Sequence, residues 1–339
     1  ERGYEMYNFN AVLVCDRSYD RDNVNIWSHD LEYTSTKYFK EIYSSLKELC
    51  PNVYVYTEIE DFESNISRHK DDVVFAAIWS GKYSRNRKAL VAAICEAQQI
   101  RYVGADAYAE ILCQDKHLSE LYCREFEIKV PNSIVLSRVD DVVKLGYLNF
   151  PVIIKPSLEG GSMGISDHNI CYTKEEVVKK FEYLSTKYLP LLVEEYIQGE
   201  EIAACIIGTP SHILRCEFVR LEINDKRYLT DEVWGFESKK CNRSKITRKV
   251  ITNEVSLENR ERILTLYKSL GKVDYMRIDC RLNDDGNFYL IELTPDCSLH
   301  PDCFMYESFR HYGLTYTDMV ETLLETVKDN YPNFKSTSQ

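Results

Sequence analysis

The sequence predicts a mixed α/β protein, and three observations lead to that prediction. The chain has 339 residues, which is enough for two or three packed domains. Apolar strand-like runs alternate with amphipathic helical segments in the N-terminal third, a pattern typical of a small parallel sheet with helices on its faces. Further along, residues 275–295 form two strand-like segments around Asn283-Asp284-Asp285-Gly286, a turn sequence that predicts an antiparallel hairpin.

The N-terminal third supports the parallel sheet in detail. Its first predicted helix places Tyr38, Ile42, Leu46 and Leu49 on one face, and a proline two residues later ends it. A domain boundary is expected between residues 104 and 115. The predicted strands here are 10–15, 53–57, 73–78 and 102–104, and the predicted helices are 34–49 and 87–99.

The rest of the chain carries further strands between helices. One helix is expected to begin after Thr173, with Glu176 completing a capping box. Two consecutive acids, Glu200 and Glu201, enter a strand end, which is unusual for a core element. Besides the hairpin, the predicted strands are 133–136, 150–157, 191–197, 200–207 and 212–223, and the predicted helices are 115–125, 140–145, 173–184, 256–270, 304–312 and 316–327.

A glycine-rich turn follows the strand that ends near Lys155. Residues 159–164 read Glu-Gly-Gly-Ser-Met-Gly, and such a turn lets backbone N–H groups approach a phosphate closely. A plain turn between two strands is the alternative interpretation. A lysine just before the turn favours the phosphate site, because a simple turn does not require one.

The hairpin brings two acids together. Asp279 alternates with Arg277 on the first strand, and Glu292 closes an apolar run on the second. Carboxylates on rigid strands suit Mg²⁺ bound between protein and phosphate oxygens. The alternative is a solvated hairpin with an ordinary ion pair.

Residues 224–250 form a polar and basic run. It reads either as a solvated surface loop or as a lid that brings cations over anionic phosphates. Its basic residues are Lys226, Arg227, Lys239, Lys240, Arg243, Lys245, Arg248 and Lys249.

Composition narrows the possible partners and compartment. The formal net charge of −12 argues against nucleic acid or an anionic membrane as the main partner. The twelve Cys include no CxxC pair and mostly lie in apolar runs, which favours a reduced, cytoplasmic protein over a zinc or disulfide protein. No apolar stretch approaches the length of a membrane span, and no signal peptide is visible. The chain starts at Glu1 rather than Met, so targeting stays open.

Taken together, these features resemble the ATP-grasp fold, and within it the D-alanine–D-alanine ligase-like branch. The resemblance covers about residues 102–327 and rests on motifs in family order: Ile-Ile-Lys-Pro-Ser around Lys155, the turn 159–164, the segment 193–201, Arg-Ile-Asp at 277–279 and Tyr-Leu-Ile-Glu at 289–292. It implies an N-terminal parallel α/β domain (1–110), a small α+β middle domain with the phosphate loop (111–197), and a C-terminal antiparallel-sheet domain with flanking helices, lid and metal site (198–339).

The resemblance also implies an ATP site, although each residue could instead be an ordinary surface or ion-pairing side chain. By family position, Lys116 and Lys155 contact the α- and β-phosphates; Gly160, Gly161 and Ser162 cover the phosphates; Glu194 and Ile197 hold the adenine edge; and Glu201 holds the ribose hydroxyls.

A metal site and two catalytic side chains follow from the same resemblance. Asp279, Glu292 and Thr294 match the ligands of two Mg²⁺ ions, with Mn²⁺ as a substitute. Arg277 matches the arginine that stabilises the transferring phosphoryl group. Lys239 matches the lid lysine over the γ-phosphate.

Several positions depart from the family pattern. Thr294 stands where the family usually has Asn, and Asp296 could compensate directly or through water. Gly161 replaces a serine of the phosphate loop. The Ser-Leu pair that holds the acceptor's carboxylate falls on Cys303-Phe304.

Other departures concern the substrates rather than ATP. The family's first-substrate motif, Gly-Gly-x-Ser-x-Glu, has no counterpart after Cys15, and Glu32 is the nearest candidate for its glutamate. His300 and Asp302 are unusual for their segment and either face the acceptor or are plain loop residues.

The leading hypothesis is an ATP-dependent carboxylate–amine ligase that forms an amide bond through an acyl phosphate. It would join an amino acid to another amino acid or to a small metabolite. The alternatives are a genuine D-alanine–D-alanine ligase, a nucleotide-binding protein without catalysis, and an enzyme that modifies a peptide or protein. A homodimer is expected by analogy.

Overall fold

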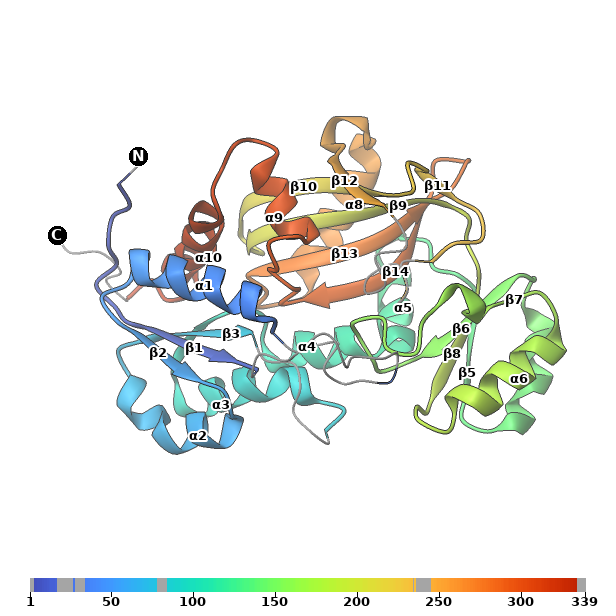
Figure 1. Ribbon diagram of the computed structural model, residues 1–339, viewed down its shortest axis with the longest axis horizontal. Coiled ribbons are helices and arrows are strands. Elements are labelled where there is room, and N and C mark those ends of the chain that lie inside the picture. Colours follow the sequence, from blue (N-terminus) through green and yellow to red (C-terminus); the bar gives the residue numbers. More distant parts are fainter. Residues whose placement is uncertain are drawn as a thin grey trace.

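The computed structural model describes residues 3–16, 27, 34–77, 84–233, 235 and 245–333. Within these ranges the chain forms three β-sheets, called here sheets A, C and B in chain order, with helices packed on their faces (Figure 1). No helix in this part of the chain is long and apolar enough to cross a membrane. The cysteines described are all free.

Sheet A is the predicted N-terminal parallel sheet, in the strand order β2-β1-β3-β4. Helix α1 covers one face and packs against the C-terminal helix α10, while α2 and α3 cover the other face (Figure 1). The elements are β1 (Ala11–Cys15), α1 (Thr36–Leu49), β2 (Val53–Tyr56), α2 (Ile59–Asn65), β3 (Val73–Ala77), α3 (Leu90–Gln98) and β4 (Arg101–Val103).

Two helices lead from sheet A to sheet C, which is antiparallel in the order β5-β8-β6-β7. Helix α6 packs apolar side chains such as Phe181 against one face of sheet C, leaving Lys155 and Glu194 on the other. The elements are α4 (Ala107–Gln114), α5 (Lys116–Arg124), β5 (Ser133–Leu136), β6 (Val152–Pro156), β7 (Ile170–Cys171), α6 (Lys174–Leu184) and β8 (Leu191–Glu195).

Sheet B holds the predicted hairpin as β13 and β14, in the order β12-β10-β9-β13-β14, with β11 paired to β9. Helices α9 and α10 cover one face, and α8 with α4 and α5 covers the other. The elements are β9 (Gly199–Thr209), β10 (His212–Ile223), β11 (Tyr228–Leu229), β12 (Ile246–Val250), α8 (Leu257–Ser269), β13 (Tyr275–Leu282), β14 (Phe288–Pro295), α9 (Phe304–Arg310) and α10 (Tyr316–Asn330).

The structure adds and corrects some elements. The sequence did not predict α2, α4 or β12, and the helix expected at 140–145 is a 3₁₀-helix over Val139–Tyr147. Thr173 does cap α6, but the Glu176 carboxylate accepts from the backbone N–H of Tyr172 rather than of Thr173, so the predicted capping box is not formed.

Candidate functional site: a cleft between two antiparallel sheets

A cleft with about 840 Å³ of empty space, part of it open to solvent, lies where sheets C and B meet. Sheet C turns its helix-free face toward the cleft, and sheet B contributes its hairpin. Side chains as far apart in the sequence as Lys116 and Glu292, which are separated by 176 residues, therefore meet here. Its lining includes Lys116, Lys155, Glu194, Arg277, Asp279 and Glu292.

Lys155 and Glu194 form a buried ion pair at the base of the cleft. They lie on neighbouring antiparallel strands, and the Lys155 Nζ to Glu194 Oε1 distance is 2.7 Å. Their side chains are only 4% and 7% exposed. The second carboxylate oxygen of Glu194, Oε2, is buried and makes no hydrogen bond within the described residues. A buried acceptor of this kind can receive an N–H donor from a ligand.

Glu120, on α5, lies behind this pair and accepts a hydrogen bond from the Ser133 hydroxyl. Burial raises the pKa of the Glu120 carboxyl, and the nearby charge of Glu194 raises it further, to about 8. Glu120 is therefore largely protonated at neutral pH, which keeps a second negative charge away from the adjoining end of the cleft.

The predicted phosphate loop lies on the sheet A side of the cleft. Gly160 and Ser162 line it, whereas Gly161 is not among its lining residues. Gly161 and Ser162 both have positive φ, at 63° and 65°, which turns the backbone sharply. The loop is also tied to the N-terminal domain, because Arg87 Nη2 lies 2.7 Å from Glu159 Oε2 and both side chains are largely buried.

The hairpin register pairs the two predicted metal ligands. Asp279 on β13 lies directly opposite Glu292 on β14, so both carboxylates stand on the same face of sheet B. Arg277 binds Asp279 through two hydrogen bonds of 2.8 Å. Lys116 Nζ lies 2.9 Å from Glu292 Oε1 and donates to the Glu159 carbonyl, so it links the hairpin to the phosphate loop.

The charges around these acids keep Glu292 ionised. Burial alone would raise the pKa of the Glu292 carboxyl, but the charges of Lys116, Lys88 and Arg277, with the hydrogen bond from Lys116, together outweigh it, and the pKa falls to about 2. For Asp279 the balance differs, because burial raises its pKa despite the bound Arg277.

This donor set fits Mg²⁺ shared between the protein and a nucleotide. No cluster of three or more His, Cys, Asp or Glu side chains able to hold a metal occurs in the described parts of the chain. Mg²⁺ commonly binds through one or two carboxylates plus phosphate oxygens, and Asp279 with Glu292 supplies such a pair. On the same strand face, Thr294 Oγ1 is buried and makes no hydrogen bond with described residues, which leaves its oxygen available as a ligand.

By sequence Asp296 could compensate for Thr294 as a metal ligand, but in this structure its carboxylate is engaged elsewhere. Its carboxylate accepts from the backbone N–H of Ala105 at 2.9 Å and lies against Gly104. It is not among the residues that line the cleft. Burial raises the pKa of Asp296 to about 8.

At the far end of the cleft, Arg281 organises the residues assigned to adenine and ribose. It donates to the Glu201 carboxylate, to the Tyr196 hydroxyl and to the Ile197 carbonyl, at 3.0, 3.1 and 3.2 Å. The sequence analysis did not assign Arg281 a role. Its position two residues after Asp279 placed it on the same strand face, and that alternation was the available signal.

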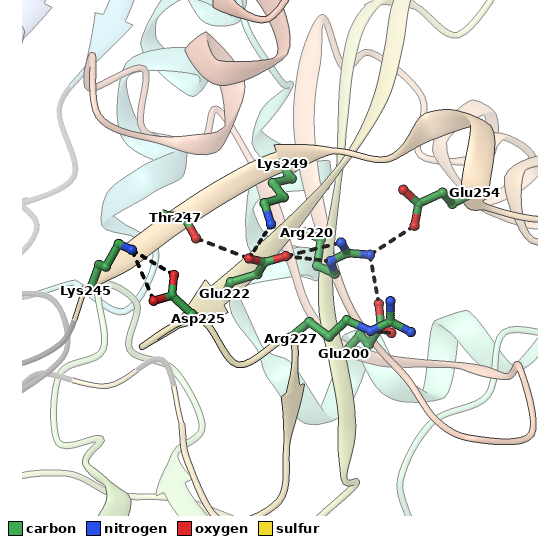
Figure 2. A network of polar contacts seen from close by, with 9 residues as sticks. All are labelled: Glu200, Arg220, Glu222, Asp225, Arg227, Lys245, Thr247, Lys249 and Glu254. Carbon is green, nitrogen blue, oxygen red and sulfur yellow. Dashed lines mark hydrogen bonds and ion pairs between the residues drawn. The ribbon is translucent and has the colours of Figure 1, made fainter.

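The basic run is anchored at both ends by ion pairs on the sheet face opposite the hairpin acids. Figure 2 shows Arg220 at the centre of this network, between Glu200, Glu222 and Glu254. Arg227 from one end of the run also reaches Glu200, and Lys249 from the other end reaches Glu222 at 2.7 Å.

Most of the described cations in the run thus pair with nearby acids rather than lining the cleft. Lys226 binds Glu232 and Lys245 binds Asp225. The predicted lid lysine, Lys239, lies outside the described residues, as does Glu32.

The segment matched to the acceptor site adjoins the hairpin through Phe304. The ring of Phe304 lies 5.3 Å from the Arg277 guanidinium carbon. The Asp302 carboxylate is bound by Lys37 of α1, and His300 packs edge-on against Tyr38.

Known proteins resemble this chain in sequence and in structure. The family model described as D-ala D-ala ligase C-terminus matches residues 124–325, more than half of the chain. D-alanine–D-alanine ligase A of Bacillus cereus is 26% identical over 262 residues, which is 75% of this chain and 81% of that protein. The D-alanine–D-alanine ligase of Thermotoga petrophila is 25% identical over 288 residues, covering 85% and 90%.

Solved structures resemble the whole chain. D-alanine–D-alanine ligase from Bacillus anthracis complexed with ATP superposes with a TM-score of 0.70 at 20% identity, covering 96% of this chain and 99% of that one. VanG D-Ala:D-Ser ligase from Enterococcus faecalis gives 0.69 at 18% identity, covering 94% and 100%. These likenesses confirm the predicted fold.

Proposed function

Because the chain belongs to the D-alanine–D-alanine ligase family and is an ATP-dependent ligase that forms C–N bonds, we propose that it joins a carboxylate to an amine through an acyl phosphate. We further propose that its substrates differ from two molecules of D-alanine. The departure at Cys303-Phe304 and the lack of a first-substrate motif after Cys15 support this second step, because both concern substrate positions while Lys116, Lys155, Asp279 and Glu292 match the family's nucleotide and metal positions.

The reaction has two balanced steps. A substrate carboxylate oxygen attacks the γ-phosphorus of ATP, the bond to the β-phosphate oxygen breaks, and ADP leaves. The amine nitrogen then attacks the acyl carbon, loses a proton, and inorganic phosphate departs with the former carboxylate oxygen. This route is needed because a free carboxylate would have to expel oxide.

The protein's part is positioning and charge neutralisation. Lys155 and Lys116 place positive charge at the phosphate end of the cleft, and the phosphate loop presents backbone N–H groups. Arg277, held by Asp279, stabilises charge on the transferring phosphoryl group. Asp279 and Glu292, with Thr294 as a further oxygen ligand, would hold Mg²⁺, which would supply electrostatic stabilisation of the phosphate charge.

One observation carries the proposal: a paired Asp279 and Glu292 face a cleft whose other wall holds the buried Lys155–Glu194 pair. In this arrangement a nucleotide base can meet the Glu194 carboxylate while its phosphates reach the acids. A binding protein without catalysis would not need Arg277 beside the metal ligands.

The test is ADP formation with Mg²⁺ across a panel of D- and L-amino acids, singly and in pairs, with products identified by mass spectrometry. Glu292→Gln serves as the inactive variant, and Glu258→Gln, an exposed acid on α8, is its matched control. Amino-acid-dependent ADP formation that Glu292→Gln lacks supports the ligase. Equal behaviour of wild type and Glu292→Gln on every substrate would favour nucleotide binding alone.

A genuine D-alanine–D-alanine ligase is the second candidate, and the printed names of the similar proteins favour it. D-alanine as sole substrate separates the two. Full turnover on D-alanine alone would contradict the proposal that the substrates differ from two molecules of D-alanine. The proposed ligase chemistry would still stand. Two Mg²⁺ ions, substitution by Mn²⁺ and a homodimer belong to the same proposal and rest on the resemblance.

A further inference from the structure

Two consecutive glutamates at the start of β9 point to opposite faces of sheet B. Side chains alternate between the faces along a strand, so Glu201 lines the cleft and Glu200 lies on the other side. Glu200 belongs to the network in Figure 2, where Arg220 and Arg227 bind it. Glu201 is bound by Arg281 at 3.0 Å. Each acid therefore has an arginine on its own face, which accounts for two acids at the end of a core strand.

Arg281 holds its position through contacts at both ends of the guanidinium group. It lies directly opposite Glu201 on the neighbouring strand, and the two side chains are only 6% and 11% exposed. Its Nη1 donates to the Tyr196 hydroxyl and to the Ile197 carbonyl, in the short connection between sheets C and B. A planar group held by three partners has a fixed orientation, and it also fixes the carboxylate that it binds.

Arg277, two residues earlier on β13, binds its acid in a different way. Its two parallel donors, Nε and Nη2, both bind the Asp279 carboxylate. Arg281 gives Glu201 only Nη2, which donates to Oε2, and its Nε is buried without a hydrogen bond to any described residue. This hydrogen bond engages one carboxylate oxygen and leaves the other, Oε1 of Glu201, to a ligand in the cleft. A ligand hydroxyl can donate to such an oxygen, and a charged acceptor makes that hydrogen bond strong.

We propose that Arg281 is a positioning residue that holds Glu201 ready to accept a hydrogen bond from a ribose hydroxyl, so that the site selects ribonucleotides over nucleotides that lack this hydroxyl. The inference rests on the proposed function and deepens it, because it defines the nucleotide that the same cleft accepts. The resemblance assigns the ribose to Glu201 and gives Arg281 no role. A site built to bind a hydroxyl rejects an analogue without it, since the buried polar group is then left unpaired.

The experiment compares ATP with 2′-deoxy-ATP and 3′-deoxy-ATP, and the analogue with the higher KM in the wild type serves as the probe. That KM should lie about 10–100-fold above the KM for ATP. Arg281→Gln should raise the KM for ATP toward that of the probe, while the KM for the probe and kcat stay nearly unchanged. Arg227→Gln, which releases Glu200 on the opposite face, is the matched control and should keep the wild-type ratio of the two KM values.

The ratio separates positioning from a merely structural role, because general damage to the cleft would raise both KM values together. Arg281→Gln leaves Glu201 charged and buried without its partner, which destabilises the fold. Arg281→Lys keeps a charge beside Glu201 but cannot hold the three partners with one planar group, so it should retain part of the discrimination. If Arg281→Gln does not fold, Arg281→Lys gives the test, and a wild-type ratio in that variant would overturn the role of Arg281.

Direct binding of the same nucleotides, measured by isothermal titration calorimetry, keeps this inference separate from the ligase function. Discrimination that is present in the wild type and lost in Arg281→Gln, without ADP formation on any amino acid, would support the role of Arg281 and overturn the ligase. Equal affinity of the wild type for all three nucleotides would overturn the inference and leave the ligase intact. An equal loss of affinity for all three in Arg281→Gln would have the same meaning.

Discussion

The proposed nucleotide cleft and the proposed acceptor region at Cys303-Phe304 are built in contrasting ways. In the cleft, acids and bases from α5, sheet C and sheet B meet at short distances, as Lys116 with Glu292 and Lys155 with Glu194 do. In the acceptor region, an aromatic ring and a thiol stand where the family has a leucine and a serine, and the cation nearest the ring comes from β12. The cleft binds ATP, which is the same for every substrate, whereas the side chains of the acceptor region can vary with the amine substrate.

This difference shows which part of the molecule is fixed by chemistry. Phosphoryl transfer requires the same charges whatever carboxylate is activated. The amine substrate, by contrast, is recognised through groups away from the reacting atoms, so its side chains can be exchanged without loss of the reaction. Substitutions in the two regions should therefore have different kinetic signatures.

The largest effect is expected from Glu292→Gln. The substitution removes a carboxylate that we propose as a Mg²⁺ ligand, so kcat should fall by about 10²–10³-fold or more. The fold should remain, as judged by circular dichroism and thermal unfolding. Near-wild-type turnover would show that Glu292 has no part in the mechanism. The assignment of Asp279 and Glu292 as Mg²⁺ ligands would then be wrong.

Lys155→Ala should lower activity comparably and also reduce stability. It leaves Glu194 charged and buried without its partner, which typically costs about 3–5 kcal/mol. The double variant Lys155→Met with Glu194→Gln should recover much of that stability in denaturant unfolding and still show no turnover. Recovery of activity in the double variant would show that the pair is structural and does not bind the nucleotide.

Arg87→Gln should have an intermediate effect confined to the nucleotide. It breaks the contact with Glu159 that ties the phosphate loop to the N-terminal domain, so the KM for ATP should rise roughly 10-fold. Arg85→Gln, an exposed neighbour, is the control. A change in the KM for the amine instead would show that Arg87 acts on the acceptor region. The kinetic distinction between the nucleotide cleft and the acceptor region would then fail.

The smallest effect on activity is expected from Glu120→Gln, which should instead alter pH-dependent stability. The folded pKa of Glu120, about 8, lies above its ordinary value near 4.5. The folded state therefore holds an extra proton between these values, and wild-type stability falls with rising pH by at most about 1.4 kcal/mol per unit. Urea unfolding at pH 5 and pH 8 should show a smaller decline in the variant; an equal decline would contradict the raised pKa.

The sequence predicted most of the fold because its signals are local. Side-chain caps, apolar faces and the Asp-Gly turn all act within a few residues, and the hairpin register then placed Asp279 opposite Glu292. Strand β12 was missed because Ile246–Val250 is polar and basic along most of its length, and its pairing with β10 depends on a partner more than twenty residues away.

The residues of the candidate site likewise fall into those that local motifs reveal and those that only tertiary packing brings together. Residues inside contiguous motifs, such as Lys155 and Glu292, could be named from the sequence. Arg87 could not, because its position follows from how separate sheets and helices pack. The protonated Glu120 was equally hidden, since its pKa depends on burial beside Glu194.

Strands β8 and β9 are consecutive in the chain but belong to different sheets, and only residues 196–198 join them. Tyr196 and Ile197 of that connection also border the cleft. A nucleotide seated there would contact the short connection between sheets C and B as well as both sheets. Binding there would therefore restrain the angle between the two sheets through a connection of three residues.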